Sequence, residues 1–327
     1  MAGAEPVSAQ PADDPLEEYI ASYCNWGRWG HGDECGTTNF VTDAIVRDAC
    51  RAVQSGRVVG LGLGFDQNGP MTGANGRFNC LRYSTATGTD HATGNQLWSG
   101  QPFPREMGYA DDVVTLPLQS ATHWDALSHI FHRGKMYNGV PTEAITAAGA
   151  SRNGVERLAD RLVGRAVLLD IPGTKGVDWM ADGYAITGAD LDEAATMARA
   201  EIREGDILLL RTGKLRHCRR DGWGDFAGGD APGLSFHSIP WLYEHRIAAV
   251  ASDTWGVEVR PNELPDSFQP FHIVALVYMG LLLGEMFDFE ALAQACAEQS
   301  RYELLLAASP LAFTGAAGAP PGPVAIL

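Results

Sequence analysis

The sequence predicts an α/β protein, because strongly apolar strand segments alternate with helical segments through its second half. The clearest strands are expected at 165–171 (RAVLLDI), 206–212 (DILLLRT) and 247–251 (IAAVA), whose composition is typical of strands covered on both faces. Helices are expected between them, at 191–200 and 237–245. The chain has no internal repeat and no clear linker, so its 327 residues predict a single domain.

The first half begins with a Pro-, Ala- and acid-rich segment, residues 1–15, which predicts a flexible acidic tail ahead of a domain spanning 16–314. Residues 42–55 predict a helix whose N-cap is Thr42, and 57–65 is strand-like. Residues 67–104 are rich in Gly, Asn and Thr and contain several aromatic residues. Loops this long inside a compact domain are usually functional or disordered, and the aromatic residues favour an ordered, functional segment.

The remaining elements follow in order along the chain. Residues 113–119 predict a strand, and Thr187 with Asp190 predicts a capping box for the helix that follows. Residues 271–283 are apolar almost throughout, and 302–308 predicts a late strand. Residues 315–327 are rich in Ala, Gly and Pro and are expected to form an extended C-terminal tail.

Composition and charge exclude several classes of function. The formal net charge of −16 argues against nucleic acid or an anionic membrane as the main partner. The longest apolar run, 273–283, is too short for a membrane helix, which needs about 20 residues. The N-terminal segment lacks the basic start and apolar stretch of a signal peptide, and the six cysteines are scattered without a C-x-x-C pair. These features predict a cytoplasmic protein with reduced thiols and a small-molecule substrate.

The segment 118–129 (LQSATHWDALSH) carries the chemistry. On an extended strand, where side chains alternate between faces, Gln119, His123 and Asp125 would share one face. On a helix, His123 and Asp125 would point about 200° apart. Imidazole and carboxylate on one face form a metal-ligand set that suits zinc, and also manganese or iron. The alternative reading is a buried His–Asp hydrogen bond without a metal.

Two neighbours of this set have different expected roles. Trp124 alternates to the opposite face of the strand and is expected to pack in the core. His129 follows a predicted turn at 127–128, which places it near the metal without making it a ligand. A histidine in that position can transfer protons near neutral pH, so His129 is the candidate general acid/base.

The segment resembles the signature of the metal-dependent cyclase/hydrolase family that includes bacterial kynurenine formamidase, isatin hydrolase and trans-dienelactone hydrolase. That signature runs H-x-G-T-H-x-D-x-P-x-H, and residues 119–129 read QSATHWDALSH. Further matches to the longer members of the family are WGRWG…DECGTTN (26–39), GDILLLRTG (205–213) and AVASDT (249–254). Together they cover about residues 25–310.

The resemblance implies further metal ligands, because such enzymes use a His and a Glu about a dozen residues apart near the C-terminus. His272 and Glu285 fit this spacing. Asp125 could then bridge two metals, or Glu285 could complete a single site. The first His of the signature is Gln119 here, as in many longer members, and Gln is a weak, neutral oxygen ligand. A single metal held by His123, Asp125 and one or two other ligands is therefore plausible.

The resemblance also implies a swivelling β/β/α fold, a mixed sheet with helices outside, and metal-assisted hydrolysis of a cyclic or aryl amide or ester. Zinc is the first candidate metal and manganese the second. The alternatives are a cyclase or dehydratase that uses the same metal as a Lewis acid, and a non-catalytic ligand-binding protein on a decayed enzyme fold. Trp26, Trp29, His91 and Tyr137 are candidate pocket walls for a flat substrate. The Trp-rich opening and the family's habit of pairing predict a homodimer or larger homo-oligomer.

Overall fold

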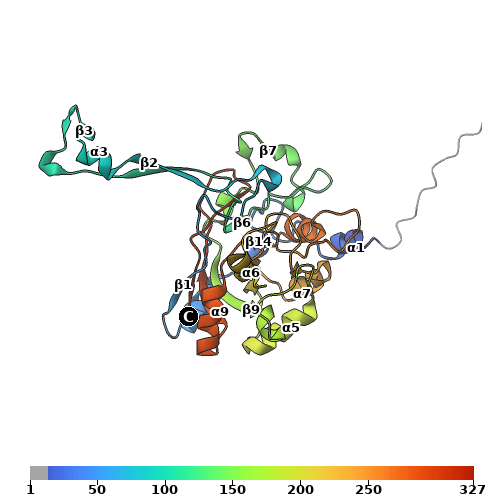
Figure 1. Ribbon diagram of the computed structural model, residues 1–327. Coiled ribbons are helices and arrows are strands. Elements are labelled where there is room, and N and C mark those ends of the chain that lie inside the picture. The colour runs from blue at the N-terminus through green and yellow to red at the C-terminus, as the bar shows by residue number, and fades with distance from the viewer. Residues whose placement is uncertain (1–13) are drawn as a thin grey trace, which may run out of the picture.

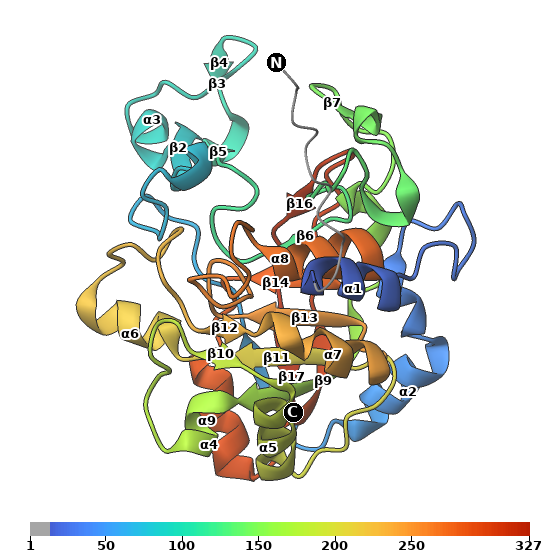
Figure 2. The ribbon, with the colours of Figure 1, turned by 90° about the vertical axis from the view of Figure 1, so that its right-hand side faces the viewer.

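The computed structural model describes residues 14–327 and is built around a mixed sheet of nine strands (Figure 2). In sheet order the strands are β1 (Val58–Gly60), β17 (Val324–Ile326), β15 (Glu303–Ala307), β9 (Val163–Asp170), β11 (Ile207–Arg211), β13 (Ala249–Ser252), β14 (Leu282–Glu285), β6 (His123–Asp125) and β16 (Gly318–Ala319). Strands β9, β11, β13 and β14 are parallel, and antiparallel strands extend the sheet on both sides. The predicted α/β class is confirmed.

The parallel strands are the most apolar part of the sequence because they are covered on both faces. Every residue of β11 and β13 is buried, as the uninterrupted apolar runs predicted. The helices are α1 (Pro15–Ser22), α2 (Asp43–Ala52), α3 (Gly88–Ala92), α4 (Ile171–Lys175), α5 (Gly188–Ala198), α6 (Lys214–Asp221), α7 (Ile239–Glu244), α8 (Pro270–His272) and α9 (Glu290–Gln299). Helices α2 and α5 both pack against β9.

Two helix starts form as the sequence predicts. The Thr42 hydroxyl accepts a hydrogen bond from the backbone N–H of Ile45 at 3.4 Å, which caps α2. At α5 the capping box is complete: Thr187 accepts from the Asp190 N–H at 3.4 Å, and the Asp190 carboxylate accepts from the Thr187 N–H at 2.9 Å. The apolar run that follows His272 forms a π-helical segment, Ile273–Met279, which leads into β14.

Residues 81–115, called here the arm, project away from the body of the molecule (Figure 1). The stem of the arm is the antiparallel pair β2 (Leu81–Ala86) and β5 (Asp111–Thr115). Its tip carries α3 and the two-residue strands β3 (Leu97–Trp98) and β4 (Gln101–Pro102). The long segment 67–104 is thus ordered, as predicted. The strand expected at 113–119 is part of the stem of the arm, and it ends at Thr115.

The stem of the arm has one largely apolar face and one mixed face. Tyr83 pairs with Val113 across the ribbon, and Leu81 lies on the same face. The opposite face carries the ion pair between Arg82 and Asp112 at 2.5 Å, together with Val114. Tyr83 is 59% exposed and Val113 is 47% exposed, although both are large apolar residues. Among residues 14–327, no element covers this apolar face. A two-stranded ribbon alone in water is only marginally stable, so we expect another surface to cover it.

The C-terminal segment is not a tail. Residues 315–327 are extended, as predicted, but they contain β16 and β17, which are strands of the main sheet. Small residues make this possible: a Cβ at Gly318 would stand 2.8 Å from the Trp124 carbonyl oxygen, so only glycine fits beside β6. The predicted acidic tail lies outside the described residues except for Asp14 and Pro15, which begin α1.

The smaller strand pairs complete the fold. They are β7 (Ile145–Thr146) with β8 (Gly149–Ala150), and β10 (Ala185–Ile186) with β12 (Gly233–Leu234). The six cysteines, all within residues 14–327, are unpaired, as predicted. Within that same range, every helix is too short or too polar to cross a bilayer.

Candidate metal centre and its pocket

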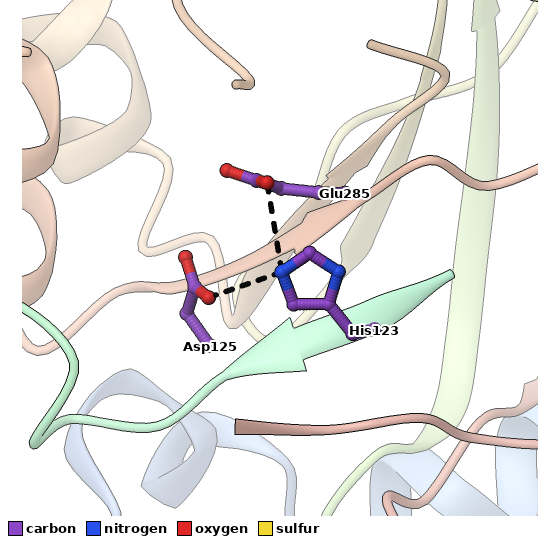
Figure 3. A group of neighbouring side chains, drawn as sticks. All are labelled: His123, Asp125 and Glu285. Atoms are coloured by element: carbon purple, nitrogen blue, oxygen red, sulfur yellow. Dashed lines mark ion pairs between the residues drawn. The ribbon is translucent and has the colours of Figure 1, made fainter. Parts of the chain in front are cut away.

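Two neighbouring antiparallel strands bring the predicted ligands together (Figure 3). Strand β6 supplies His123 and Asp125, which share one face because they are two residues apart. Strand β14 supplies Glu285, which lies directly opposite His123 in the pairing register. Trp124 points to the other face, where its ring packs edge-on against Phe287 in the core.

The three side chains are fully buried or nearly so, and their polar atoms face one another. His123 Nε2 lies 3.3 Å from Asp125 Oδ1 and 3.5 Å from Glu285 Oε2. His123 Nδ1–H donates to the Ala121 carbonyl at 2.8 Å, which fixes the ring and leaves Nε2 directed at the two carboxylates. His123 Nε2 and both Asp125 oxygens are buried without a good hydrogen bond in the described chain.

Buried polar atoms without a hydrogen-bond partner are rare in proteins, and three of them in one place indicate that a binding partner is missing. One imidazole nitrogen and two carboxylates, with ligand atoms within 4.8 Å of one another, form a donor set that suits a divalent cation. The residues therefore fit the metal that the sequence predicts at this position.

His129 follows β6 after a tight turn, as predicted, in which its N–H donates to the Ala126 carbonyl at 2.9 Å. His129 Nε2 lies 3.7 Å from Asp125 Oδ1, which is too far for a hydrogen bond. Burial lowers the pKa of His129, and the positive charge of Arg77 adds to this effect although Asp125 opposes it. The imidazole is therefore neutral at pH 7 and able to accept a proton.

His272, at the end of α8, lies beside the cluster and is held by a residue that the sequence analysis missed. Its Nδ1 contacts the Glu258 carboxylate at 2.5 Å, and its Nε2 lies 3.3 Å from Glu285 Oε1. Glu258 also accepts from the backbone N–H groups of Phe271 and His272. Burial opposes a charge on His272, but the two carboxylates outweigh it and raise its pKa to about 10. Carboxylates that orient a histidine in this way commonly support metal ligands.

Gln119 lies outside the strand that carries His123 and Asp125. The strand that was predicted to run through 113–119 stops before it, and the chain turns because the Ser120 N–H donates to the Pro117 carbonyl at 3.1 Å. Strand β6 begins only at His123, so the period-2 argument does not extend back to Gln119. The half-buried Gln119 amide instead lies against Gly318 of β16.

The four residues predicted to form pocket walls lie elsewhere in this chain. Trp26 donates its indole N–H to the Val277 carbonyl and stacks on Tyr278, and Trp29 packs on Phe40. Tyr137 is a buried core residue whose hydroxyl donates to Asp33, and His91 is on α3 in the arm. Aromatic character alone did not distinguish packing residues from pocket residues.

A pocket of about 380 Å³ opens beside the cluster. Glu285, His129 and His272 line one side of it, which places the metal site at the pocket surface. Its other lining residues come from the loop before the arm and from three segments of the body, and they are Asn75, Arg77, Ile130, Phe131, Trp255, Phe268, Gln269 and Ile273. Sequence spacing could not identify these residues, because they meet only in the folded chain.

Comparison with known proteins assigns the chain to a family. A family model described as "Putative cyclase" matches residues 83–259, which include His123, Asp125 and His129. A solved structure described as a novel cyclase is 34% identical to this chain, covers 93% of it and 100% of its own length, and superimposes with a TM-score of 0.85. The chain belongs to the cyclase family.

Other cyclase-family folds are more distant. Isatin hydrolase A from Labrenzia aggregata, bound to benzyl benzoate, is 17% identical to this chain and has a TM-score of 0.57. The match covers 82% of this chain and 93% of the isatin hydrolase chain. An isatin hydrolase bound to the product analogue thioisatinate is 19% identical, with coverage of 83% and 92% and a TM-score of 0.57. At these identities the likeness extends to the fold alone. A search of curated proteins finds no match.

Proposed function

We propose that this cyclase-family chain is a metal-dependent hydrolase that opens a cyclic or aryl amide or ester, such as a lactone, a lactam or an N-formyl group. The observation that carries this proposal is the set of orphaned atoms on His123 and Asp125 beside Glu285, at the surface of a pocket. Hydrolysis of a cyclic amide is also the reaction named for the isatin hydrolases that share this fold.

The proposed ligands are His123, Asp125 and Glu285, and His272 is the fourth. His272 is suited to this role because its Nδ1 is engaged by Glu258, so its Nε2 is the nitrogen that faces the cluster. Zinc fits this mixed nitrogen and oxygen set, and manganese is the next candidate. When bound, such a metal polarises a carbonyl and lowers the pKa of a water molecule, to about 7 in the best zinc sites.

His129 is the proposed general acid/base. Its neutral imidazole accepts a proton from the attacking water at Nε2 and returns it to the leaving nitrogen or oxygen. Asp125 lies near enough to stabilise the imidazolium that forms in between, since Oδ1 is 3.7 Å from Nε2. Burial of the cluster on β6 and β14 excludes bulk water from the side of the site that faces the core.

The proposal predicts that chelation abolishes hydrolysis and that zinc or manganese restores it. Protein with verified metal content would be assayed against a lactone, a lactam and an N-formyl aryl amide, with the release of acid followed in a pH-stat. Turnover that persists in protein verified as metal-free would contradict the proposal. Metal-dependent turnover that consumes no water would instead favour the cyclase or dehydratase alternative.

We also propose that the chain forms a homo-oligomer in which the apolar face of the arm packs against a second copy. The exposed Tyr83 and Val113 support this proposal, because an isolated ribbon needs cover on its apolar face. Light scattering should give at least twice the chain mass of 35.0 kDa. Tyr83→Lys should weaken the assembly, whereas Ser84→Lys, on the opposite face beside Asp112, should not. A 35.0 kDa species for the parent protein at micromolar concentration would contradict the proposal.

A further inference from the structure

One cation lines the pocket without an acidic partner. Arg77 lies just before the arm, is half-buried, and forms part of the same pocket surface as His129 and Glu285. Among residues 14–327 its guanidinium makes no ion pair and no hydrogen bond to a side chain or backbone group. Most arginines of this acidic chain do have a carboxylate partner, for example Arg165 with Asp206 and Arg211 with Asp170.

The surroundings of Arg77 hold it in place without neutralising it. Its guanidinium carbon lies 5.5 Å from the centre of the Trp255 ring, a cation–π distance, and Arg260 lies 5.3 Å from the same ring. Trp255 is 5% exposed, and its indole N–H is buried without an acceptor in the described chain. This part of the pocket therefore carries a positive charge that no carboxylate of the described chain neutralises.

The backbone here is also strained. Asn75 and Gln269 both line the pocket and have positive φ angles of 53° and 52°, which are uncommon for residues other than glycine. Strain of this kind persists only where the surrounding structure enforces it, and it concentrates at ligand sites.

We propose that Arg77 binds a carboxylate of the substrate, so that this chain acts on acid-bearing cyclic or aryl amides and esters in preference to neutral ones. The substrate class rests on the proposed hydrolase function, whereas the anion site itself does not. A guanidinium binds a carboxylate through two parallel hydrogen bonds, and the nearby Trp255 ring attracts the guanidinium of Arg77. Arg77, His129 and Glu285 line the same pocket. A substrate whose acid group binds Arg77 can therefore extend across the pocket toward His129 and the metal cluster.

The experiment is calorimetric titration with benzoate and with its neutral analogue benzamide. The protein used is the His123→Ala chain, treated with a chelator and verified as metal-free, so that the carboxylate cannot bind a metal instead. Arg77→Gln in that background should weaken benzoate binding by about 10- to 100-fold and leave benzamide binding unchanged. Arg77→Lys should retain part of the affinity, since it keeps the charge but not the fork. Arg47→Gln removes a cation from the exposed face of α2 and is the matched control.

Equal benzoate affinity in the His123→Ala chain and in its Arg77→Gln and Arg47→Gln derivatives would overturn the proposal. Because no turnover is measured, this result is independent of whether the hydrolase assay succeeds. In an active protein assayed well above the pKa of His129, which the charge of Arg77 lowers, the kinetic counterpart is a rise in KM for an acid-bearing substrate in Arg77→Gln. The kcat and the KM of a neutral substrate should change little. A loss of kcat for both substrates would instead make Arg77 part of the chemistry and would contradict a role in substrate selection.

Discussion

Replacing His123 by alanine is expected to lower the metal content of the purified protein from a stoichiometric level to well below it, and to abolish turnover. His123 Nε2 is the only imidazole nitrogen that lies within 4 Å of both Asp125 and Glu285 among residues 14–327, so its loss removes the shared centre of the ligand set. His272 Nε2 and the two carboxylates then remain, and we expect this set to hold zinc more weakly because it lacks the histidine that lies close to both carboxylates.

Elemental analysis of the parent and variant proteins checks this result. His217→Ala is a suitable control, because His217 lies partly exposed on α6, stacked on Trp179 and away from the cluster. Unchanged metal content in His123→Ala would remove His123 as a ligand and most of the proposed function with it. A parent protein without any metal would revive the alternative of a ligand-binding protein on a decayed enzyme fold.

The second large effect is expected for His129→Asn, which should keep the metal and the fold but lose turnover by about 10²- to 10⁴-fold, the usual contribution of a general acid/base. His129 is partly exposed at the pocket surface, and its ring makes no hydrogen bond to the cluster, so asparagine can replace it without leaving Asp125 short of a partner. Steady-state kinetics, metal analysis and thermal melting of the same preparation separate these outcomes.

The pH dependence gives an independent check on His129. The parent rate should fall as pH decreases through the pKa of His129, since only the neutral imidazole accepts a proton. Burial and the nearby charge of Arg77 place that pKa below the ordinary histidine value of about 6.5. The acid limb should flatten in His129→Asn. Loss of metal in this variant would make His129 a ligand, and near-normal turnover would exclude it from the mechanism.

Local patterns in the sequence were sufficient for the parts of the fold that depend on neighbours along the chain. The apolar runs of β9, β11 and β13 and the capping residues Thr42 and Thr187 behave as predicted, because burial on both faces and helix capping leave a direct signal in composition and spacing. The pairing of His123 with Asp125 on one face follows from strand periodicity alone.

Features that depend on contacts between segments far apart in the chain could not be predicted from local patterns. Gln119 was assigned to a strand that in fact ends at Thr115, because a turn enforced by one backbone hydrogen bond interrupts the alternation. Glu258 and Arg77 reach the site only through the packing of α8 and of the loop before the arm, so no local spacing distinguishes them. The C-terminal segment resembles a tail in composition because the space beside β6 requires small residues.

The pairing of β6 with β14 also determines when the metal site can exist during folding. At one end of this pairing, the Thr122 hydroxyl donates a hydrogen bond to the Met286 carbonyl. These two residues are 164 positions apart in the chain. Contacts of such long sequence separation form slowly, because the entropy of closing a large loop must be overcome first. The ligand set is therefore absent from a partly folded chain, and a metal ion cannot template the early steps. The proposed metal would bind the native state alone and draw the equilibrium toward that state, so we expect more folded protein to accumulate where the metal is available.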